Sequence, residues 1–305
     1  MYALPNIWEF ASVISKFFLY VSVASIAGGS FSLLFFNDDR RLIIQRHLIY
    51  ILVGSLLGFH SVVFYFLFQI GLINDAGLAG ILDWDMAQFL FTLPLGEATM
   101  LRLGGFILAL LGSVLLLRYT NRLEQAPGRN FFRIIINVAG LSLVVIALSF
   151  QVTGHVSQLS LTAQAAIAVH VIAIALWLGA LFPLYSLTND CPLEGLQLTM
   201  KRFGNFAIYI VALLVFSGGL MLLQLFDSPV ELLTSAYGRS VVIKLVLVLA
   251  LLSLAGLNKL YLVPRLLSGN SIEELRKSIK TEMLVGTLIL LVTSYFSTVV
   301  GPAEH

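Results

Sequence analysis

The sequence predicts an all-α membrane protein with eight transmembrane helices, and composition and patterning both point to it. Of its 305 residues, 59% are hydrophobic and only 11% are charged, whereas a soluble domain carries about 25% charged residues. The apolar residues gather in runs of the length that spans a bilayer, which takes about 20 residues in a helix. None of the runs alternates apolar with polar residues, so a helix bundle rather than a β-barrel is expected.

The eight predicted helices are the eight apolar runs, which lie at 10–36, 47–71, 101–118, 133–151, 164–187, 205–226, 240–262 and 283–300. The longest connection, about 72–100, is predicted to hold a short interfacial helix around Asp83, Trp84 and Asp85. The first run follows no basic segment and is too long for a cleaved signal sequence, so it is expected to stay as a helix.

The distribution of basic residues predicts the orientation in the membrane. Fourteen of the 18 Lys and Arg residues lie in the four connections 36–47, 118–133, 188–204 and 259–282. Connections rich in Lys and Arg stay in the cytoplasm. Both termini are therefore predicted outside, together with the loop that carries His155. The remaining four basic residues lie near this outer end: Lys16, Arg102, Arg239 and Lys244.

An internal similarity suggests that the eight helices are two tandem four-helix repeats in parallel orientation. Segments 92–102 and 234–244 align without a gap, and each opens an outside-to-inside helix. They share a threonine, a glycine and a basic residue: Thr92, Gly96 and Arg102 against Thr234, Gly238 and Lys244. The first half is then 1–133 (helices one to three) closed by the fourth helix at 133–151, and the second half is 152–305 (helices five to eight).

The glycine of each repeated segment is expected to end the outer loop before its helix begins. The basic residue that follows, Arg102 or Lys244, has two interpretations. Its side chain either extends back to the lipid headgroups or pairs with an outer carboxylate such as Glu97.

Two histidines near the outer end form the candidate metal site. His155 follows a glycine in the loop after the fourth helix, and His170 lies about two turns inside the fifth. A neutral imidazole binds metals, and an ionisable group inside a membrane span is a functional hypothesis by default. A loop and two helical turns can bring both rings to one point. The alternatives are an ordinary loop histidine and a helix histidine bonded to a neighbour.

Three further residues are candidate ligands. His60, in the middle of the second helix, is a deeper ligand, a proton carrier or an interhelical hydrogen-bonding group. Met100 and Met221 lie near the outer ends of the third and sixth helices and offer a soft sulfur, although methionine often only fills space. The single cysteine, Cys191, rules out a disulfide within the chain and a thiolate cluster.

Small residues predict a close helix contact. Gly179 and Ala180 in the fifth helix allow another helix to approach closely, and the stretch 28–30 in the first helix, Gly-Gly-Ser, is the expected counterpart. Gly218 and Gly219 in the sixth helix either serve packing in the same way or loosen the backbone where a metal passes. Packing is the favoured interpretation.

From about residue 140 to 302, these motifs in their order and spacing resemble the copper resistance protein D (CopD) family of bacterial inner-membrane proteins. The resemblance rests on 153–155, His170, 177–181, 201–204, 217–220, 237–244, 258–264 and Glu282. It implies a protein of the bacterial inner membrane that binds copper and moves it inward from the periplasm. With the orientation predicted above, both termini are then periplasmic. The candidate copper ligands are then His155, His170, His60, Met100 and Met221, for Cu(I) or Cu(II). The implied partner is a small periplasmic copper-binding protein similar to CopC.

Two rival functions stay open: a b-type haem protein with haem between His60 and His170, and a non-transporting membrane protein that docks or senses a periplasmic copper carrier. Several other classes are not expected. The chain has no phosphate-binding loop and no phosphorylatable aspartate motif, which excludes an ATP-driven pump. It shows no nucleophile–base pair typical of an enzyme. The net charge of +2 is spread between helices and indicates no nucleic-acid partner.

Overall fold

The computed structural model describes residues 5–35, 41–74, 77–123, 127–153, 160–226, 228, 230–268 and 272–300. In these ranges eight helices are long and apolar enough to cross a membrane, as predicted. They are α1 (Ile7–Phe35), α2 (Arg41–Asn74), α4 (Pro94–Arg122), α5 (Arg129–Val152), α6 (Leu161–Asp190), α7 (Leu193–Leu225), α9 (Ala236–Leu257) and α10 (Ile272–Tyr295). Two π-helical turns, η3 (Asn258–Leu262) and η5 (Phe296–Val300), continue α9 and α10.

Several helices begin well before the apolar runs that predicted them. The helix α7 begins at Leu193 rather than at 205, and α10 begins at Ile272 rather than at 283. The first turns of α10 carry Glu273, Glu274 and Arg276. Hydropathy marks the part of a helix inside the hydrocarbon, whereas the backbone stays helical into the polar zone.

Short helices fill the two longer connections at one end of the bundle. The elements η1 (Leu78–Leu82) and α3 (Trp84–Phe91) precede α4, and α8 (Glu231–Thr234) precedes α9. The predicted short helix is therefore present as α3. The Asp83 side chain caps it by accepting a 3.0 Å hydrogen bond from the Met86 backbone N–H. This bond lowers the pKa of the Asp83 carboxyl.

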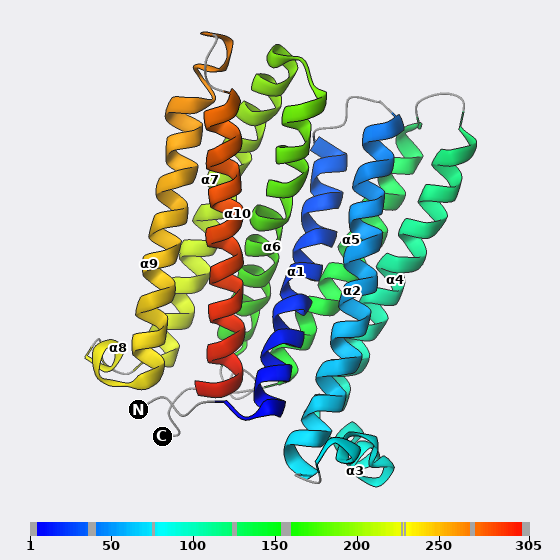
Figure 1. The fold of residues 1–305 in the computed structure, drawn as a ribbon, viewed down its shortest axis with the longest axis vertical. Coiled ribbons are helices and arrows are strands. Elements are labelled where there is room, and N and C mark those ends of the chain that lie inside the picture. Colours follow the sequence, from blue (N-terminus) through cyan, green and yellow to red (C-terminus); the bar gives the residue numbers. More distant parts are fainter. Residues whose placement is uncertain are drawn as a thin grey trace.

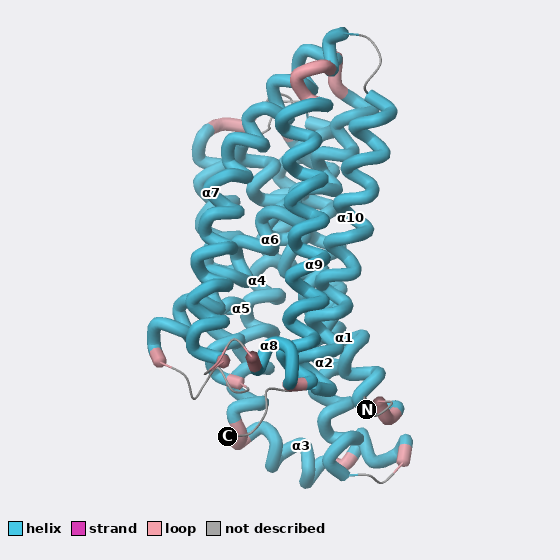
Figure 2. Tube along the Cα trace, turned by 90° about the vertical axis from the view of Figure 1, so that its left-hand side faces the viewer, coloured by secondary structure: helices cyan, strands magenta, loops and turns pink. Residues whose placement is uncertain are grey.

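The long helices run side by side in one bundle (Figure 1). The two halves of the chain meet where α1 of the first half packs against α6 of the second. One buried apolar cluster joins α1, α2, α4 and α5, and a second joins α6, α7, α9 and α10. The short helices α3 and α8 lie at the end where α1 begins (Figure 2). This is the end predicted to face outward, and the four basic connections lie at the opposite end.

The expected small-residue contact is where α1 crosses α6. A Cβ atom added to Gly28 would lie 1.8 Å from the carbonyl carbon of Gly179. A Cβ atom on Gly179 would lie 1.7 Å from the carbonyl oxygen of Ala24. The two backbones therefore touch directly, which confirms the predicted close approach. Because α1 is also the most buried span, this crossing holds the centre of the bundle.

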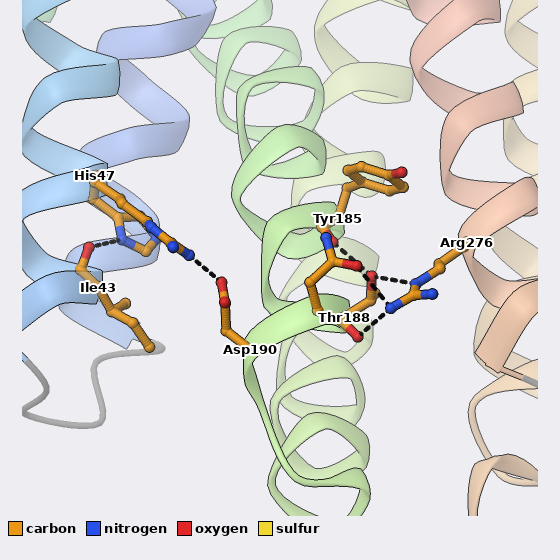
Figure 3. Close-up of polar contacts among 8 residues, drawn as sticks. Ile43, His47, Tyr185, Thr188, Asp190 and Arg276 are labelled. Carbon is orange, nitrogen blue, oxygen red and sulfur yellow. Dashed lines mark hydrogen bonds and ion pairs between the residues drawn. The ribbon is translucent and has the colours of Figure 1, made fainter.

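Polar contacts tie the C-terminal end of α6 to both halves (Figure 3). Arg46 of α2 forms an ion pair with Asp190. Arg276 of α10 donates from Nε to the hydroxyl of Thr188 at 3.0 Å and from Nη2 to its carbonyl oxygen at 2.9 Å. A cation at a helix C-terminus interacts favourably with the helix dipole. In the same view, the His47 ring lies against the carbonyl of its own helix, 2.7 Å from the Ile43 oxygen.

The two similar segments have similar local geometry. Gly96 and Gly238 both lie in the first turn of a long helix, against the backbone of the short helix before it. An added Cβ would lie 2.3 Å from the Phe91 oxygen at Gly96 and 2.2 Å from the Glu231 oxygen at Gly238. The glycines therefore lie inside the helices rather than ending the loops, which corrects that expectation. The tandem-repeat organisation and its boundaries stay a prediction.

Candidate functional site

His170 lies on α6 and contacts α7 through Ser217. Its Nδ1 is 3.2 Å from the Ser217 hydroxyl oxygen. That hydroxyl donates its one proton to backbone carbonyls of its own helix, chiefly to Leu213 at 2.6 Å. It is therefore an acceptor for the ring, and Nδ1 carries the imidazole proton.

This tautomer leaves the lone pair of Nε2 available for a metal. The hydrogen bond described for the ring is the one at Nδ1, to Ser217. A ligating histidine commonly donates its other ring N–H to a protein acceptor, which orients the ring and fixes its tautomer. Ser217 performs that role for His170.

Gly218 makes the space that the ring occupies. A Cβ added to Gly218 would lie 3.3 Å from His170 Cε1 and 3.6 Å from Nδ1, whereas a Cβ added to Gly219 would meet nothing within 4 Å. The first glycine of the pair is therefore needed for packing against the ring. The packing interpretation favoured from the sequence therefore holds for Gly218 but not for Gly219.

Met221 is the predicted ligand best placed to accompany His170. It follows Ser217 by one turn on α7, so the two side chains share a helix face, and it is half-buried. Because α7 ends at the outer end of the bundle, Met221 lies between the outer surface and the level of His170. His155 lies outside the described residues, in the connection between α5 and α6.

The structure does not bring His60 or Met100 to this site. His60 lies on an exposed part of α2, its Nδ1 is 2.8 Å from the Leu56 carbonyl of its own helix, and its ring packs edge-on to Phe59. Met100 is 59% exposed on α4, beside a shallow pocket that includes Glu97.

A haem bridging His60 and His170 finds no support in this arrangement, because α1 packs between α2 and α6. Within the described ranges, no group of three or more His, Cys, Asp or Glu residues is arranged to hold a metal. Besides the His170 imidazole, a metal site here therefore needs a sulfur ligand such as Met221, or a residue outside the described ranges such as His155.

The side chain of Arg102 follows neither of the two arrangements predicted for it from the sequence. Arg102 is buried, with 4% of its surface exposed. Its Nε donates to the Ser149 hydroxyl at 3.0 Å, and its guanidinium lies 5.1 Å from the centre of the Phe150 ring. It neither pairs with Glu97, which is exposed, nor extends to the headgroups. α5 supplies polar and aromatic partners that the spacing along α4 could not reveal.

Lys244 lies on α9, close enough to His170 to interact with it electrostatically. Its Nζ forms no ion pair with a described acidic residue. The positive charge of Lys244 opposes the binding of a metal ion at His170. The repulsion is twice as large for a divalent ion as for a monovalent ion.

Ser217 and a buried pair in the inner half, Asn258 and Glu282, are polar positions to which sequence reasoning assigned no role. The Asn258 amide donates to the Glu282 carboxyl. Both pairings link residues on different helices, so spacing along one helix cannot predict them. The hints available in the sequence were a polar residue inside an apolar run and the presence of all three positions in the motifs that carry the family resemblance.

Comparison with known families agrees with the geometry over most of the chain. Residues 7–160, from α1 through α5, match the model of the copper resistance protein D-like N-terminal domain. Residues 197–296, from α7 through α10, match the model of copper resistance protein D. No curated protein and no solved structure matches the chain. The first match alone covers half of the chain. The eight long apolar helices of the described chain are those of a multi-pass membrane protein. The chain belongs to the copper resistance protein D family.

Proposed function

We propose that this protein is a permease, not an enzyme, that carries copper across the bacterial inner membrane from the periplasm to the cytoplasm. The observation that carries the proposal is His170, an imidazole inside a membrane helix whose Nδ1 lies 3.2 Å from the Ser217 hydroxyl oxygen. Donation from Nδ1 to that oxygen leaves Nε2 for a metal. Copper reaches the outer end, is captured by His170 together with His155 and Met221, and then moves inward. A small periplasmic copper-binding protein similar to CopC delivers it.

The charge distribution supports the orientation that the proposal assumes. The basic connections gather at one end of the bundle, which favours a cytoplasmic position for that end and a periplasmic position for both chain ends. His170 lies about 13 Å along α6 from its start at Leu161. A metal that enters from the periplasm would therefore reach His170 within the outer half of α6.

The surroundings of His170 favour copper(I) as the transported ion. Imidazole and thioether suit the softer ion, and Met221 offers a thioether on the neighbouring face of α7. The charge of Lys244 opposes a divalent ion more strongly than a monovalent one.

Copper uptake into proteoliposomes tests the proposal. The purified protein is reconstituted with a copper(I)-sensitive dye inside, and copper is added outside under reducing conditions. Uptake is expected to exceed that of protein-free liposomes, and His170→Ala is expected to reduce it about tenfold or more. Copper binding without uptake by the wild type would contradict a permease and favour the docking or sensing function.

Adding a methyl group beside the His170 ring is expected to weaken copper binding. In Gly218→Ala the new Cβ lies 3.3 Å from the ring, so the ring must shift from its bond to Ser217, and we expect about tenfold weaker binding. Gly219→Ala, next in the chain, adds the same methyl group to open space and should bind as the wild type does. Affinities from titration with a competing copper(I) chelator provide the comparison. Equal affinities of the two variants would contradict the assigned position of the ring.

A further inference from the structure

The inner half of the bundle contains a buried carboxyl group that copper capture at His170 does not use. Glu282 is the one buried acidic residue in the described part of the chain, with 3% of its surface exposed. It lies ten residues after the start of α10, about 15 Å along the helix, directly before the apolar run that begins at 283. An ionised carboxylate there costs several kcal/mol or more unless it is paired.

The partner of Glu282 is an amide rather than a cation. Asn258 donates from Nδ2 to Glu282 Oε1. It lies at the first position of η3, where its carbonyl accepts from Val263 N–H at 2.9 Å across a π-helical turn. Such turns inside longer helices often occur at functional sites.

The Asn258 amide has an unused acceptor. Its Oδ1 is buried and forms no hydrogen bond with the described residues. A buried acceptor without a donor costs about 1–3 kcal/mol. A protonated Glu282 supplies this donor, because a carboxylic acid and an amide pair side by side through two hydrogen bonds. The amide N–H then donates to the acid carbonyl, and the acid O–H donates to the amide oxygen.

Three cations on η3 and α10, the elements that carry Asn258 and Glu282, have other partners. Lys259 of η3 donates to the Gly204 carbonyl at 2.7 Å and to Asn205 Oδ1 at 2.8 Å, both on α7. Lys280 of α10 lies over the ring of Tyr185 on α6, and Arg276 is bonded to α6 and to Glu273. The charged residues of α1 and α9 lie toward the outer end: Glu9, Lys16, Arg239 and Lys244. Asn258 is the one group found to interact with the Glu282 carboxyl in the described structure.

Ser278 adds a second unused polar atom beside the carboxyl. It precedes Glu282 by one turn on the same face of α10, and its hydroxyl is buried with no hydrogen-bond partner in the described residues. Many other helix serines here, such as Ser55 and Ser142, donate to the carbonyl four residues earlier. The hydroxyl of Ser278 is therefore available to solvate the carboxyl when the proton leaves.

We propose that Glu282 and Asn258 form a proton-binding site, in which Glu282 is a carboxylic acid paired with the amide and exchanges its proton with the cytoplasmic end as copper moves. In the exchange the Glu282 O–H bond breaks, the proton passes to water, and the carboxylate keeps the Asn258 N–H bond. The reverse step restores the acid. The coupling to copper rests on the proposed permease function, whereas the protonated pair does not.

Infrared spectroscopy of the reconstituted protein tests the protonated pair without copper. The wild type at neutral pH is expected to show the carbonyl stretch of a protonated carboxyl, shifted in D2O and lost in Glu282→Gln. Gln is the matched variant, because its amide can form the same two hydrogen bonds with Asn258 but cannot titrate. A wild-type spectrum identical to that of Glu282→Gln would overturn the proton site.

The uptake assay with an imposed pH gradient tests the coupling. Wild-type uptake is expected to change several-fold with the gradient, whereas Glu282→Gln should bind copper normally and respond to the gradient less than twofold. A Glu282→Gln variant as gradient-sensitive as the wild type would overturn the coupling. Because the infrared measurement needs no transport, failure of the permease function would show separately, as absence of wild-type uptake at every gradient.

Discussion

Gly179→Ala is expected to destabilise the bundle by at least about 3 kcal/mol, at the upper end of the usual cost of overpacking a core. The added Cβ would lie 1.7 Å from the Ala24 carbonyl oxygen and 2.9 Å from the Gly28 backbone nitrogen. Both opposing atoms belong to the backbone, so no side-chain rotation can relieve the overlap. The helices α1 and α6 must separate, and the packing at the centre of the bundle is lost with them.

Gly140→Ala is the matched control for this prediction. Gly140 lies within the membrane-spanning helix α5, and an added Cβ there would meet nothing within 4 Å. Alanine is the better helix former by about 1 kcal/mol, so this variant should be as stable as the wild type or more so. Thermal unfolding in detergent, with the yield of monodisperse protein, compares the two. A Gly179→Ala protein that melts with the wild type would show that α1 and α6 do not cross at these glycines.

The second large effect is expected at the copper site. His170→Ala removes the Nε2 ligand and should weaken copper(I) binding by about 100-fold or more. Ser217→Ala leaves the ligand but removes the acceptor that fixes its tautomer, and should cost about tenfold, in the usual range for such supporting groups. Because a proton and copper compete for Nε2, wild-type affinity should fall as the solution becomes more acidic. Competition with a chromogenic copper(I) chelator measures all three effects.

His60→Ala is the control for the histidine substitutions. The His60 ring lies on the exposed side of α2 and contacts Leu56 and Phe59 of its own helix. Its removal should leave copper affinity within about twofold of the wild type. A loss in His60→Ala as large as that in His170→Ala would contradict a copper site formed by α6 and α7.

The number and order of the membrane helices could be predicted from the sequence because a span has a minimum apolar length. The contact of Gly28 with Gly179 could also be anticipated, since only small residues allow two membrane helices to touch. The ends of the helices could not be predicted from the apolar runs, because polar turns such as those at the start of α10 remain helical outside the hydrocarbon.

The candidate site was only partly predictable for a related reason. An imidazole inside an apolar helix identified His170 as a candidate. Which way a side chain points is harder to infer when lipid and core are equally apolar, because the polar face that orients a soluble helix is missing. His60 and Met100 were therefore grouped with His170, although the structure exposes both of them. The Ser217 contact crosses between two helices and follows only from their packing.

The most direct test of copper binding at His170 is the X-ray absorption spectrum of the copper(I)-loaded protein. The wild type is predicted to show the scattering pattern of an imidazole ligand, and His170→Ala is predicted to lose one imidazole from the copper environment while His60→Ala loses none. An unchanged copper environment in His170→Ala would contradict the central claim that His170 binds the copper.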